Sequence, residues 1–231
     1  FIYISGYEWG PGVSKIILSL SSYIDDAKKD GSAIWTSKKE RKIVSIYLSN
    51  AEGEHITGKS SYITLELETI IDPNGPRCPF SFNINKLQNE WASEYKVEGR
   101  IEVTVGNKDM NINFEQDCIK NRFCPDTERF KVRGKHSGKY QHPRREEIIS
   151  LSLQYAGYEP KELKEDGVKN PLIIWLNGQG EGGTDVDIAL LGNEVTSLSK
   201  PKIQKYFTTE NGSNGAYVLV VQCPTYWMDG G

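Results

Sequence analysis

The sequence lacks the features that mark membrane proteins and nucleic-acid-binding proteins. No apolar run approaches the roughly 20 residues that a membrane-spanning helix requires. The net charge is −3, so no overall basic field attracts nucleic acid or an anionic membrane. Short basic runs at residues 38–42 and 142–145 are typical of solvated surface. We therefore predict that neither nucleic acid nor a membrane is a partner of this chain.

The sequence also lacks the spacing of a metal site. It has three histidines, and its four cysteines show no C-x-x-C pair, so we predict no metal and no cofactor. Two alternatives remain open for the pair of cysteines that enclose residues 119–123: a small disulfide loop or two buried thiols. The four cysteines are Cys78, Cys118, Cys124 and Cys223.

The first half of the chain carries a β pattern. Short runs of apolar and β-branched residues alternate with turn residues, and no convincing amphipathic helix interrupts them. At least five such runs in about 130 residues predict an all-β sandwich of immunoglobulin-like size. The predicted strands lie at residues 13–20, 43–48, 62–68, 80–84 and 100–105.

The composition changes between residues 131 and 145, where Lys, Arg, His, Gly and Ser replace almost all apolar residues. A polar segment of this kind is typical of a domain boundary. We predict two domains, residues 1–132 and residues 133–231.

The second half has a different pattern. Five consecutive apolar residues, 172–176, follow Pro171 and predict a strand buried on both faces. Residues 216–221 form a second continuous apolar run, and segments of helical character lie between the two runs. Strand, helical crossover and strand within about 50 residues predict a βαβ unit in a mostly parallel sheet.

A glycine-rich loop follows the first of these strands. Four of the six residues 178–183 are glycine, which permits backbone conformations that side chains would forbid. In open α/β sheets, ligands bind outside the carboxyl ends of the strands. The loop is therefore the main candidate site, and the alternative is a plain connection from strand to helix.

Several motifs together resemble the opening of a bacterial family of α/β-hydrolase esterases, the prolyl-oligopeptidase-like and feruloyl-esterase-like proteins. Some of these esterases carry an N-terminal immunoglobulin-like domain. The resemblance covers nearly the whole chain and implies a sandwich followed by the N-terminal part of an α/β-hydrolase domain. The motifs lie at residues 6–18, 171–185, 191–196, 215–220 and 224–229.

The resemblance assigns roles to the glycine-rich loop. In that family a His-Gly-x-Gly loop supplies backbone N–H groups to the oxyanion hole of ester cleavage. Gly178, Gln179 and Gly180 occupy the matching positions, with the N–H of Gln179 as the best candidate donor. Asn177 stands where the family usually has histidine, and we expect its side chain to brace the loop by hydrogen bonds.

The sequence has no Gly-x-Ser-x-Gly motif, and all three histidines precede the loop, opposite to the chain order of the family. We therefore expect the N-terminal part of a secreted serine carboxylesterase that is inactive alone. Its substrates would be acyl or feruloyl esters of plant polysaccharides, bound once a C-terminal segment or a complementing chain completes the site. An incomplete sheet also favours association of the isolated chain, as a homo-oligomer or with such a partner. The alternative is a degenerate hydrolase kept as a binding module, whose sandwich mediates assembly or carbohydrate contact.

Overall fold

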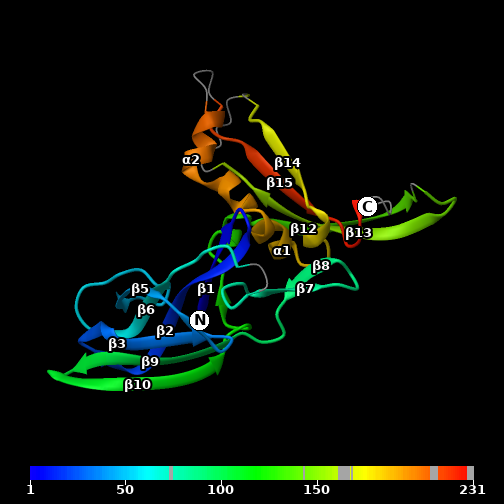
Figure 1. Cartoon of the computed structure of the whole chain (residues 1–231). Helices are drawn as coiled ribbons and strands as arrows, with labels where there is room; N and C mark the ends of the chain where they lie inside the picture. Colours follow the sequence, from blue (N-terminus) through cyan, green and yellow to red (C-terminus); the bar gives the residue numbers. More distant parts are fainter. Residues whose placement is uncertain (73–74, 143, 161–166, 168, 209–212, 228–231) are drawn as a thin grey trace. The chain divides into compact units, whose positions relative to one another are not determined.

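The computed structural model describes residues 1–72, 75–142, 144–160, 167, 169–208 and 213–227. The chain divides into two compact units (Figure 1). The first unit comprises Phe1–Ser5, Pro11–Ser81 and Trp91–Cys124, and the second comprises Gly6–Gly10, Phe82–Glu90 and Pro125–Gly231. The boundary predicted between residues 132 and 133 stays a prediction.

The first unit is built on two sheets, as expected for a β-sandwich. The five-stranded sheet has the order β11-β1-β2-β6-β5, and the four-stranded sheet has the order β10-β9-β3-β4. The strand pairs β2–β6 and β5–β6 in the first sheet, and β3–β9 and β9–β10 in the second, are antiparallel. The strands are β1 (Ile2–Tyr7), β2 (Gly10–Ile24), β3 (Asp26–Thr36), β4 (Lys39–Arg41), β5 (Ile43–Ser49), β6 (Ser60–Leu67), β9 (Lys96–Val105), β10 (Lys108–Asp117) and β11 (Arg122–Phe123). A separate hairpin pairs β7 (Phe80–Asn83) with β8 (Gln88–Trp91).

The core of the sandwich contains a buried guanidinium group. Arg41 is only 2% exposed, and its Nη2 donates to the carbonyl oxygens of Val13 at 2.9 Å and Glu68 at 3.1 Å. Burial lowers the pKa of Arg41 and raises the pKa of Tyr95 to about 12. The Tyr95 hydroxyl donates to the carbonyl of Pro76, which also accepts from Arg41. Arg41 thus donates to carbonyl groups from three chain segments inside the sandwich.

Cys118 and Cys124, which enclose the segment 119–123, are both buried thiols rather than a disulfide. Burial raises the pKa of the Cys118 thiol, which keeps it in the protonated form.

The second unit contains a four-stranded sheet of order β12-β13-β15-β14 (Figure 1). Its strands are β12 (Val132–Gln141), β13 (Ile148–Tyr158), β14 (Leu172–Leu176) and β15 (Tyr217–Gln222). β14 and β15 pair in parallel, so the chain makes the predicted helical crossover between them. The prediction of a mostly parallel sheet is wrong for the described residues, because β12, β13 and β15 pair antiparallel. β12 and β13 form a long hairpin, and a direct hairpin connection requires antiparallel strands.

β14 is covered on one face only, so the prediction of a strand buried on both faces is also wrong. Leu172, Ile174 and Leu176 are 56%, 58% and 56% exposed. The alternate residues, Ile173 and Trp175, pack against a buried cluster formed by β13, β15 and the helices. β14 is the edge strand of its sheet among the described residues, and no described element covers the face of its three exposed side chains.

Short helices cover the other face of the sheet. Asp185 caps the first α-helix by accepting a hydrogen bond from the N–H of Asp187. Leu190 and Leu191 are fully buried. Of the helices in the described residues, none is long and apolar enough to cross a membrane. The helices are α1 (Val186–Gly192), α2 (Pro201–Gln204), and the 3-10 turns η1 (Thr127–Arg129), η2 (Gln179–Glu181), η3 (Val195–Ser199) and η4 (Lys205–Phe207).

Candidate functional site

The glycine-rich loop begins where β14 ends and forms the 3-10 turn η2 before α1. Gly178 precedes the turn in an extended conformation, with φ −71° and ψ 170°. Gly178 and Gln179 are exposed, and Gly180 is half-buried. The sequence-predicted loop residues therefore lie together at the carboxyl end of a strand, where a ligand can reach them.

Two backbone N–H groups of this loop are available to a ligand. The first N–H groups of a helical turn have no partner within the turn. The N–H of Gly178 donates to the carboxylate of Glu181, and the N–H of Glu181 donates to the carbonyl of Gly178 at 3.1 Å. Within the described part of the chain, the N–H groups of Gln179 and Gly180 have no acceptor. These two neighbouring donors are able to bind an oxyanion or another small acceptor.

Asn177 connects the start of the loop to the segment that follows β15. It is 4% exposed, and its side-chain Oδ1 accepts from the N–H of Cys223 at 2.9 Å. Its Nδ2 donates to the carbonyl of Gly178 at 2.6 Å, and its own carbonyl accepts from the indole N–H of Trp227 at 2.7 Å. The amide side chain supplies both a donor and an acceptor, so one residue ties the two strand ends together.

Glu181 is a residue of the loop that sequence reasoning missed. Burial raises the pKa of its carboxyl group, and this effect outweighs the hydrogen bonds from the Gly178 N–H and the Asn193 side chain. Gly192 makes room for the side chain, since a Cβ there would lie 2.3 Å from the Glu181 Cγ. Glu181 therefore folds back under its own loop and fixes the position of Gly178. An acidic residue inside a glycine-rich run is the signal that points to such a role.

Two glutamines, also missed by sequence reasoning, form hydrogen bonds at the C-terminal end of the loop and to the segment after β15. Gln222 is fully buried, and its Nε2 donates to the carbonyls of Glu181 and Asp185, each at 2.9 Å. Gln88 donates to the carbonyl of Pro224 at 3.1 Å. A Cβ on Gly182 would lie 2.4 Å from the Gln88 Nε2 and 2.9 Å from the backbone carbonyl oxygen of Thr225, so the close backbone favours glycine at this position. No local sequence signal reveals these contacts, because they join segments far apart in the chain.

Comparison with known proteins connects the sandwich to esterases. Residues 3–110 match the family model described as the esterase Ig-like N-terminal domain. The sandwich is therefore similar to this class of domain. A sequence comparison with curated proteins gave no match.

The fold of nearly the whole chain is also found in an esterase. The crystal structure of a thermostable esterase matches 97% of the chain with a TM-score of 0.68 and 20% sequence identity. The chain spans 57% of the length of that esterase. At this identity the match shows that the two chains share a fold.

Proposed function

We propose that the chain supplies the oxyanion loop of a secreted serine carboxylesterase. The observation that carries this proposal is the pair of N–H groups on Gln179 and Gly180, which have no acceptor in the described chain. They lie at the carboxyl end of β14, in a fold that is shared with a thermostable esterase. The matching Ig-like domain supports the same class of protein.

In the proposed reaction, a serine hydroxyl attacks the ester carbonyl carbon and a general base takes the serine proton. The carbonyl oxygen becomes an oxyanion, and the N–H of Gln179, joined by that of Gly180, donates hydrogen bonds to it. Asn177 and Glu181 hold the loop so that these donors need no rearrangement when the charge develops. Collapse of the tetrahedral intermediate then expels the alcohol.

This chain has no Gly-x-Ser-x-Gly motif, and its three histidines all precede the glycine-rich loop. An oxyanion donor stabilises charge only after a nucleophile has attacked. We therefore propose that the 231 residues are inactive by themselves and act with a further segment or a complementing chain. The substrate class that we propose is acyl or feruloyl esters of plant polysaccharides.

The test is a substitution that removes only the backbone donor. Gln179→Pro deletes one N–H at the first position of the turn, where proline is well tolerated. The extended conformation of Gly178 also suits a residue before proline. In the polypeptide as its gene encodes it, we expect the substitution to lower kcat for a p-nitrophenyl ester about 10²- to 10³-fold.

Gln179→Ala is the matched variant, because it removes the exposed side chain and keeps the N–H. Its effect on kcat should be far smaller than that of proline. Equal losses in the two variants, or no loss in either, would contradict the role of the backbone donor. The 231-residue chain alone should show no turnover above buffer. Turnover that a serine-directed inhibitor abolishes would overturn the proposal that it is inactive alone.

A further inference from the structure

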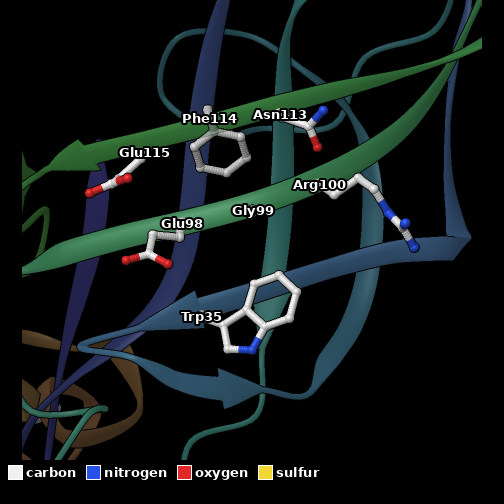
Figure 2. Close-up of a pocket in the computed structure, with 7 residues that line it drawn as sticks. All are labelled: Trp35, Glu98, Gly99, Arg100, Asn113, Phe114 and Glu115. Carbon is white, nitrogen blue, oxygen red and sulfur yellow. The ribbon is translucent and has the colours of Figure 1, made fainter.

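The solvent face of the four-stranded sheet in the first unit has a hollow of about 620 Å³ (Figure 2). It lies across β3, β9 and β10 and is lined by Gly99, Phe114 and five further residues, one aromatic and four polar. These are Trp35, Glu98, Arg100, Asn113 and Glu115. None of them takes part in the glycine-rich loop, so a role of this hollow is independent of ester cleavage.

The strand register places all five side chains on the same face of the sheet. Trp35 is directly opposite Glu98. Glu98 is directly opposite Glu115, and Arg100 is opposite Asn113. Residues directly opposite each other, and residues two apart on one strand, project from the same face. The alternate residues Ile34, Val97 and Ile101 are fully buried in the sandwich core, so the other face, with its five side chains, meets solvent.

A small residue keeps the space beside the indole ring open. Ala33 lies two residues before Trp35 on β3 and directly opposite Arg100 on β9. On the shared face, its methyl group is therefore the neighbour of Trp35 along β3 and of Arg100 across to β9. The indole is half-buried, so one part of the ring is anchored to the sheet and the remainder is accessible.

The polar groups around the ring include both donors and acceptors. Arg100 is oriented by its Nε, which donates to the carbonyl of Gly31 at 3.3 Å, and Glu115 lies 3.5 Å from the Nζ of Lys96. Across the residues that the structure describes, no hydrogen bond engages the indole N–H of Trp35, the carboxylate of Glu98 or the amide of Asn113. These groups are free to bind a ligand that offers hydroxyl groups.

This combination fits one ligand chemistry. A pyranose ring has a face of C–H groups, which suits the electron-rich face of an indole, and an edge of hydroxyl groups that both donate and accept. The guanidinium of Arg100 disfavours a cationic ligand, and the carboxylates of Glu98 and Glu115 disfavour an anionic one. We propose that this hollow binds neutral sugar units of a polysaccharide chain, with Trp35 as the stacking platform.

Titration of the 15N-labelled 231-residue chain tests the proposal without any need for turnover. The probes are xylohexaose, cellohexaose and mannohexaose, each added separately while the indole N–H resonances of the five tryptophans are recorded. We expect at least one hexaose to shift the Trp35 resonance in a saturable manner. Trp35→Ala should weaken the affinity for that hexaose at least tenfold, measured by calorimetry.

Trp9→Ala is the control, because Trp9 is 37% exposed in the second unit and should leave the affinity unchanged. Asn113→Ala, an exposed substitution, is the second variant if Trp35→Ala fails to fold, and it should weaken binding by several-fold. The proposal is overturned if no hexaose shifts the Trp35 resonance, or if the variants bind as the unaltered chain does. It is also overturned if a lysine-rich peptide shifts that resonance and the three sugars do not.

Discussion

The two units place their apolar strands in different surroundings. In the sandwich, β6 buries Ile63 and Leu65 completely, and the facing sheet of the same unit completes the cover. In the second unit, β14 has apolar side chains on both faces but is covered on one, with Ile174 58% exposed. An apolar pattern therefore predicts which faces of a strand are suited to burial. It does not predict whether another element of this chain packs against them.

The largest change in stability is expected in the sandwich of the first unit. Arg41→Met removes the side-chain donor of the Val13 and Glu68 carbonyl groups and should lower the free energy of unfolding of the sandwich by about 3–5 kcal/mol. Hydrogen exchange of peptides from β2 and β6 measures the stability of this unit separately from that of the other. The control is Lys42→Met, at the exposed neighbouring position, which should change the free energy of unfolding of the sandwich by less than about 1 kcal/mol. A loss for Arg41→Met as small as that of the control would mean that water satisfies these carbonyls.

A pair of substitutions on β14 tests whether only one face of this strand in the second unit is covered. Ile173→Ala removes a side chain that packs against the buried cluster and should cost about 2–3 kcal/mol of stability. Ile174→Ala, one residue away, should change stability by less than about 0.5 kcal/mol, because that side chain faces solvent. Chemical denaturation of the 231-residue chain measures both variants. Similar losses at the two positions would show that the exposed face is covered in solution, by another copy for example.

The smallest effect concerns the pH dependence of the loop. Because burial raises the pKa of Glu181, the folded state keeps a proton that the unfolded state releases at a lower pH. The stability contribution of this proton is fully present below the ordinary carboxyl pKa and is lost as pH rises through the higher folded pKa. Glu181→Gln cannot titrate, so its stability relative to the unaltered chain should increase from pH 4 to pH 7. Thermal unfolding at several pH values checks this, and a difference that stays constant or decreases toward pH 7 contradicts it.

Local pattern was sufficient for several features. Alternating residues such as those of β6 predict a strand with one covered face, and the four glycines after β14 predict a loop at a strand end. The apolar run that became β15 and the helical segments before it predicted the parallel crossover. These features depend on residues that are close in sequence, so periodicity and turn chemistry are enough to predict them.

Other features depend on residues far apart, and no local pattern encodes them. Asn177 is 46 residues from its partner Cys223, and the choice of an antiparallel neighbour for β15 required the hairpin of β12 and β13. The burial of Glu181 depends on the space left by Gly192. The sequence by itself determined where the strands, turns and glycine-rich loop lie, because these follow from local periodicity. Only the tertiary structure decided which faces are covered and which N–H groups of the loop remain available, because partners distant in the chain must first be brought together.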